Sequence, residues 1–123
     1  MQTKSIGLKT LIKGLLIPGQ LLLAAVAVAD LMDGVTLYRH LTSGNSTGEG
    51  YAAGYIAGIA DVGSSVRRSS AVLGQKFCLP EGVTVGQLKD GVRVYLERHP
   101  AERQQAAVPL VARALAEAFP CRK

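Results

Sequence analysis

The sequence predicts an all-α protein, a small four-helix bundle-like domain stapled by one disulfide. Apolar residues recur at the three- and four-residue spacing of helices, and no two-residue alternation indicates a sheet. The only two cysteines, Cys78 and Cys121, bracket one predicted two-helix unit. Removing a predicted export segment, residues 1–29, from the 123-residue chain leaves 94 residues. A domain of that size has a modest core and benefits from a covalent link.

The N-terminal segment has the three parts of a secretory signal. Three lysines form a positive region, and an uncharged apolar run of 15 residues extends from Leu15 to Ala29. Small residues at positions 27–29 fit a signal peptidase site. The run is shorter than the roughly 20 residues of a membrane-spanning helix, and Pro18 interrupts it. We therefore expect a cleaved signal peptide at 1–29, a mature domain at 30–123, export to the periplasm, and no stable membrane insertion after cleavage.

Charge argues against a nucleic-acid partner. The whole chain has 14 basic and 9 acidic residues, a formal charge of +5. Without the three lysines of the signal, 11 basic and 9 acidic residues remain, a charge of +2. No stripe of Lys and Arg with interleaved aromatic residues remains, so nucleic-acid binding is not predicted.

Two helices are predicted in the first half of the mature chain. Asp33 is a good N-cap, and the face of the helix that follows carries Leu37, Tyr38 and Leu41. Residues 43–50 contain no apolar side chain and three glycines, and they predict a loop. A second helix is expected over residues 51–66, rich in Ala and Gly, with one apolar face: Tyr55, Ile59, Val62 and Val66.

A third helix has the clearest local signals. Thr84 and Gln87 form a capping box, which predicts a helix beginning at Val85. His99 precedes Pro100 and should end it, because the residue before proline avoids helical dihedrals. Its predicted buried face comprises Val85, Leu88, Val92, Tyr95 and Leu96.

The fourth helix is predicted to restart near Ala106, with Pro109 in its first turn. Arg113 and Glu117 are spaced as an i, i+4 surface pair. Phe119 and the following proline should terminate the helix. Its predicted apolar stripe comprises Leu110, Val111, Ala114, Leu115 and Ala118.

The two cysteines are predicted to form a disulfide. The alternative is a catalytic thiolate paired with His40 or His99, but the apolar neighbours of Cys78 do not favour a thiolate. Two scattered histidines make no metal site. Glu97 and Glu102 are interpreted as ordinary surface charges. No catalytic residue, metal ligand or cofactor is therefore predicted, which favours a binding protein over an enzyme.

Several short motifs occur together between residues 34 and 121. They are Gly54-Tyr55-Ile56-Ala57-Gly58-Ile59-Ala60-Asp61, Phe77-Cys78-Leu79-Pro80-Glu81-Gly82-Val83-Thr84, Gln87-Leu88, Tyr95-Leu96, His99-Pro100 and Ala114-Leu115-Ala116-Glu117-Ala118-Phe119-Pro120-Cys121. In this combination the chain resembles the type VI secretion amidase immunity proteins, the Tai-like family.

The resemblance implies a small helical periplasmic protein that binds a peptidoglycan amidase effector and occludes its Cys/His active site. It also implies a homodimer as a second assembly, because members are often dimeric. One feature departs from the family, which usually has another cysteine pair between its first two helices. Here Ala52 stands at one of those positions, and no cysteine lies between Leu37 and Ser43.

Two other functions remain open on the sequence: an accessory or chaperone-like subunit of an envelope, secretion or conjugation system, and a small hydrolase. Partner contacts must come from surface that folding leaves free. The polar loop at 43–50 is one candidate. The connection at 67–76 is favoured, because Arg67, Arg68, Gln75 and Lys76 offer donors to an acidic rim.

Overall fold

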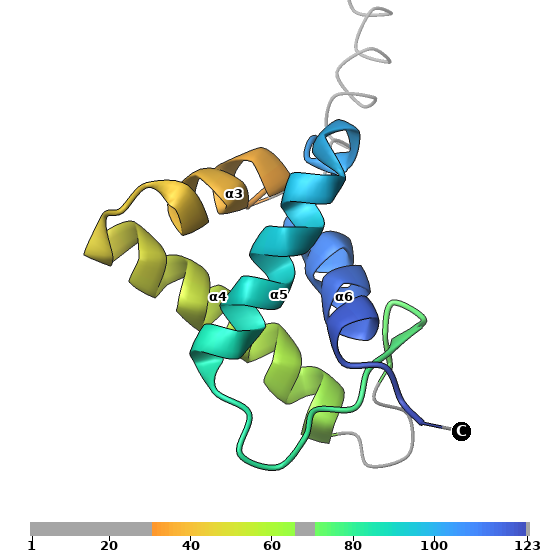
Figure 1. The fold of residues 1–123 in the computed structure, drawn as a ribbon. Coiled ribbons are helices and arrows are strands. Elements are labelled where there is room, and N and C mark those ends of the chain that lie inside the picture. The colour runs from red at the N-terminus through yellow and green to blue at the C-terminus, as the bar shows by residue number, and fades with distance from the viewer. Residues whose placement is uncertain (1–30, 66–70, 123) are drawn as a thin grey trace, which may run out of the picture. The chain divides into compact units, whose positions relative to one another are not determined.

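Four helices with short connections make up the part of the chain that the computed structural model describes, residues 31–65 and 71–122 (Figure 1). The predicted signal segment and residues Arg67 and Arg68 lie outside it. The all-α, four-helix prediction is confirmed. None of the described helices is both long enough and apolar enough to cross a membrane. In chain order the elements are α3 (Gly34–Thr42), α4 (Ser46–Ser65), β1 (Ala71–Val72), β2 (Gln75–Lys76), α5 (Val85–Arg98), the 3-10 helix η1 (Pro100–Glu102) and α6 (Ala107–Ala118).

Helix α3 begins at the predicted cap. The Asp33 carboxylate accepts a hydrogen bond from the Thr36 backbone N–H at 2.7 Å. This bond stabilises the charged form and lowers the pKa of Asp33. Leu37 and Leu41 are buried, as predicted, and Tyr38 packs against the core at its edge.

Main-chain bonds join the start of α3 to the connection between α5 and α6. Gly34 N–H donates to the Gln105 carbonyl at 3.0 Å, and Val35 N–H donates to the Arg103 carbonyl at 2.8 Å. Gly34 has to be glycine here, because an added Cβ would lie 2.7 Å from the Arg103 carbonyl oxygen. The first and last described helices are thereby held together at this end.

Helix α4 begins earlier than predicted. The expected loop at 43–50 is wrong for residues 46–50, which form the first turn. The Asn45 side-chain oxygen accepts from Thr47 N–H at 2.9 Å and so caps the helix. This turn is mostly exposed and needs no apolar residue, so the absence of an apolar pattern did not mean a loop.

The buried face of α4 is also different from the predicted one. Val62 is 60% exposed, while Tyr55 and Ile59 lie half-buried at the margin of the core. Val66 lies outside the described residues. The face that packs inward comprises Ala52, Ile56, Ala60 and Gly63. Small side chains on this face let the α4 backbone approach its neighbours closely, which offsets the smaller apolar area of each residue.

Helix α5 agrees with its local signals. Gln87 N–H donates to the Thr84 hydroxyl at 3.2 Å, and Thr84 N–H donates to the Gln87 side chain at 2.9 Å, so the capping box is confirmed. The helix ends before His99, as predicted. Four of the five predicted core residues are buried: Leu88, Val92, Tyr95 and Leu96. Val85 is 44% exposed, since it lies in the exposed first turn of α5.

Helix α6 restarts at the predicted place, with Pro109 in its first turn. Ala118 is exposed because it is the last helical residue, beyond the edge of the core. The other predicted stripe residues are buried: Leu110, Val111, Ala114 and Leu115. Together with Phe77, Leu37, Ile56 and Leu96 they form one continuous core.

The predicted disulfide is present. Cys78 and Cys121 are bonded, with their Cα atoms 4.9 Å apart. Cys78 itself is exposed, while Phe77 beside it is buried. The bond links the segment after the hairpin to the segment after α6.

Candidate functional site

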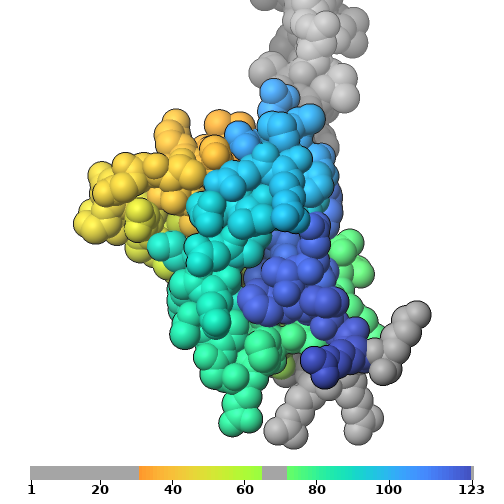
Figure 2. Space-filling model, in the orientation of Figure 1, coloured from red at the N-terminus to blue at the C-terminus, as the bar shows by residue number. Residues whose placement is uncertain are grey.

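A small hairpin interrupts the connection that was expected to be irregular. β1 and β2 pair antiparallel, with Val72 opposite Gln75 and Ala71 opposite Lys76. In Figure 1 the hairpin (green) lies beside α6, and in Figure 2 it lies at the edge of the molecule in that view. Two of the four predicted contact residues, Gln75 and Lys76, are therefore adjacent on one strand, with Lys76 exposed.

Leu73 was not among the predicted contact residues, yet it occupies the tip of this hairpin. Its side chain is 66% exposed. The available signal was an apolar residue followed by glycine in a polar connection, a pattern compatible with a tight hairpin turn.

The α3–α4 corner forms a second candidate surface, a hollow of about 540 Å³. It includes the first residues of the segment that was predicted to be a loop. The His40 and Tyr51 rings meet edge to face with centroids 5.5 Å apart. The hollow is lined by Arg39, His40, Ser43, Asn45, Thr47, Gly48 and Tyr51.

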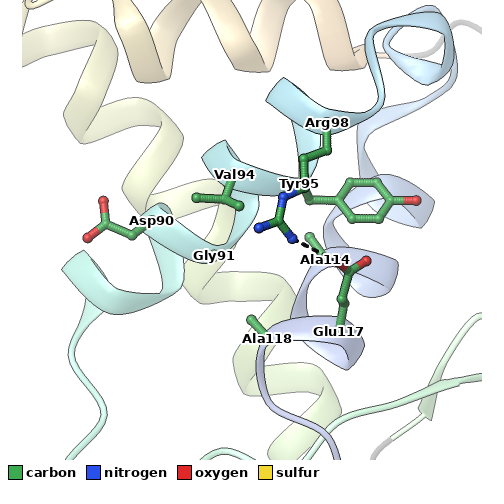
Figure 3. Close-up of a pocket in the computed structure, with 8 residues that line it drawn as sticks. All are labelled: Asp90, Gly91, Val94, Tyr95, Arg98, Ala114, Glu117 and Ala118. Atoms are coloured by element: carbon green, nitrogen blue, oxygen red, sulfur yellow. Dashed lines mark ion pairs between the residues drawn. The ribbon is translucent and has the colours of Figure 1, made fainter.

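A third surface is a groove of about 260 Å³ between α5 and α6 (Figure 3). Gly91 lets the two helices approach, since an added Cβ would lie 3.0 Å from the Ala118 Cβ. Arg98 reaches across the groove to Glu117, with an N–O distance of 3.5 Å. The groove is largely apolar, and this exposed ion pair spans it.

The connection from α5 to α6 is held by polar contacts that the sequence analysis missed. Glu102 accepts from Arg113 at 2.5 Å and from the Tyr95 hydroxyl at 3.2 Å. The interpretation of Glu102 as an ordinary surface charge is therefore wrong, as is the predicted Arg113–Glu117 pair. Arg113 reaches backwards to Glu102 and Gln105, at 2.9 Å from the latter, a long-range arrangement that helical spacing does not indicate.

Packing also orders the two rings at the end of α5. The His99 ring stacks on Tyr95 with centroids 4.1 Å apart, and its Nδ1 lies 2.8 Å from the Tyr95 carbonyl oxygen. Burial raises the pKa of the Tyr95 hydroxyl. Arg103 donates to the Leu96 carbonyl at 2.7 Å and lies over the Tyr38 ring. These residues fix the shape of the connection.

The comparison with known families favours one of the open functions. The sequence model of the Rap1a immunity proteins matches residues 24–121. The chain belongs to the Rap1a immunity protein family. This is a type VI secretion immunity family, so membership identifies the chain as an immunity protein that binds a partner effector protein. No curated protein matches the chain.

Membership in the Rap1a family implies an inhibitor rather than an enzyme. The structure tests one enzymatic alternative directly, that of a catalytic cysteine. Cys78 and Cys121 are joined to each other, so neither sulfur is a thiolate nucleophile in this state. Within residues 31–65 and 71–122, no cluster of three or more His, Cys, Asp or Glu side chains could hold a metal ion. For this Rap1a protein, the surfaces described above are considered as protein-binding sites.

Proposed function

We propose that the mature chain, residues 30–123, is a periplasmic immunity protein that binds a peptidoglycan amidase effector and blocks its active site by steric occlusion. Membership in the Rap1a family is the observation that carries the proposal. The resemblance of the motifs around both cysteines to Tai-like proteins supports an amidase as the target. The disulfide is compatible with an oxidising compartment, and the pattern of residues 1–29 supports export.

The proposed contact surface is the connection that contains the hairpin. Lys76 is exposed, and no ion pair within the described residues involves it. Together with Arg67, Arg68 and Gln75, it would supply donors to carboxylates at the rim of the effector's active site. A homodimer is the second proposed assembly, and sedimentation of the mature protein measures it.

The test is inhibition of a defined amidase. The mature protein is titrated against a purified type VI peptidoglycan amidase, while binding is followed by calorimetry and peptidoglycan hydrolysis is assayed. Stoichiometric binding with loss of hydrolysis is expected. If there is no binding, the proposal fails for that amidase. Co-purification from periplasm with secretion or conjugation proteins would instead favour the accessory-subunit function.

The contact residues have a separate test. Replacing Arg67→Ala with Arg68→Ala is expected to weaken binding of the amidase roughly tenfold, since each exposed ion pair contributes up to about 1 kcal/mol. The melting temperature should barely change. Arg93→Ala, which removes a cation of α5 that lines neither candidate hollow, is the matched control and should leave the affinity unchanged. Unchanged affinity in the double variant would remove both arginines from the contact surface.

A further inference from the structure

Leu73 occupies a backbone conformation that leucine disfavours. The hairpin turn consists of Leu73 and Gly74, whose φ angles are +51° and +78°. Two positive φ values in a two-residue hairpin define a type I′ turn, which favours Asn, Asp or Gly at its first position. A side chain with a Cβ is crowded in this left-handed region, so leucine there costs folding free energy. Asparagine would serve the turn better.

The Leu73 side chain gains little from the fold in return. It is 66% exposed at the tip, whereas Val72 before it packs against the core. A large apolar side chain that is both exposed and in a disfavoured conformation contributes little to stability. Backbone outliers of this kind cluster at functional sites, where the surrounding structure holds them in place.

The residues that follow β2 hold the hairpin firmly on its C-terminal side. Phe77 directly follows β2, is 1% exposed, and lies against Gly63 of α4 in the space that a Cβ would need. The next residue, Cys78, is bonded to Cys121, and its N–H donates to the Phe119 carbonyl at 2.9 Å. An apolar side chain on a rigid support loses little entropy when it binds.

We propose that Leu73 is the apolar anchor of the hairpin and inserts into an apolar pocket on the effector protein. The rim of that pocket is acidic, because Lys76 is the one charged residue between positions 71 and 80. A few central residues in well-packed pockets supply most of the binding energy at protein interfaces, and weaker contacts surround them. The inference rests on the proposed function and adds the residue that dominates the contact.

Replacing Leu73→Asn tests the anchor, because the change favours the turn conformation but removes the apolar side chain. Stability and affinity should therefore respond in opposite directions. Asparagine tolerates the left-handed conformation, so the melting temperature should stay the same or rise. Affinity for the type VI peptidoglycan amidase that the unmodified protein binds, measured by calorimetry with the full mature protein, should fall at least about tenfold. Val85→Asn, at another exposed apolar position, is the matched control and should retain wild-type affinity.

Three results would overturn the proposal, and they are distinguishable. Wild-type affinity in Leu73→Asn, with binding measurable in the unmodified protein, overturns the anchor alone. A clear drop in melting temperature would show that Leu73 serves the fold. If the unmodified protein does not bind the amidase, the proposed function fails, and the anchor fails with it.

Discussion

The α3–α4 pair and the α5–α6 pair are stabilised in different ways. α5 has a reciprocal capping box, and polar contacts of Glu102 fix its connection to α6, whose end carries the disulfide. α3 and α4 have no covalent link, and α4 contributes mainly small residues to the core. A disulfide and directional polar contacts stabilise the second pair, whereas the first pair depends mainly on close packing. The two kinds of stabilisation predict different responses to substitution.

The largest effect is expected from removing the covalent link of the second pair. Cys78→Ser with Cys121→Ser opens a loop of 43 residues in sequence separation, which chain entropy values at about 4 kcal/mol. Urea melts of the unmodified protein and of the double variant measure the loss in free energy of unfolding. Thiol titration of unmodified periplasmic protein under denaturant should find no free thiols. Two titratable thiols would mean that this pair relies on packing as much as the first.

The next effect tests the buried face of α4. Ile56→Ala is expected to cost about 3 kcal/mol, because Ile56 is fully buried among the helices. Val62→Ala, on the face that the apolar pattern favours, should cost less than about 0.5 kcal/mol. Denaturant melts of the two variants compare them directly. Equal losses, or a larger loss for Val62→Ala, would contradict the packing described for the first pair.

The smallest effects compare one helix cap from each pair. Thr84→Ala and Asp33→Ala should each cost about 1 kcal/mol at neutral pH. Only the penalty of Asp33→Ala is expected to change at acid pH. Because the folded-state pKa of Asp33 is lowered from 3.8, its stabilisation is present above that value and is lost as pH falls through the folded pKa.

Melts of both cap variants and the unmodified protein, from neutral pH to below pH 3.8, make this comparison. The Asp33→Ala penalty should shrink over that range, whereas the Thr84→Ala penalty should persist. A penalty at Asp33 that stayed constant in acid would show that the charged carboxylate is not the cap.

The same contrast explains what the sequence could predict. The cap at Thr84, the end at His99 and the restart of α6 depend on neighbours within a few residues, and all were predicted correctly. The predicted buried face of α4 was wrong. Ala and Gly occur on every side of this helix, so contacts with three partner helices determine which side is buried. The bonds from Arg113 to Glu102 join residues 11 positions apart across a turn, so no helical spacing indicates them.

For the candidate site too, features set by the local sequence were predictable and features set by the folded backbone were not. Gln75 and Lys76 were predicted as contact residues from their polar side chains in a connection, and the structure places both on strand β2. Leu73 was not predicted, because its candidate role depends on a backbone φ angle that only the folded hairpin displays. The disulfide was predictable since the chain offers one possible pairing.

The bonds between α3 and the α5–α6 connection have a consequence for sequence divergence. They run from backbone N–H groups to backbone carbonyls, so their donors and acceptors do not depend on side-chain identity, while the Arg103 side chain separately holds the connection through the Leu96 carbonyl. Gly34 is the position that this arrangement fixes. At its exposed positions, 101 and 104, the connection can therefore change its side chains while the backbone bonds to α3 keep its path.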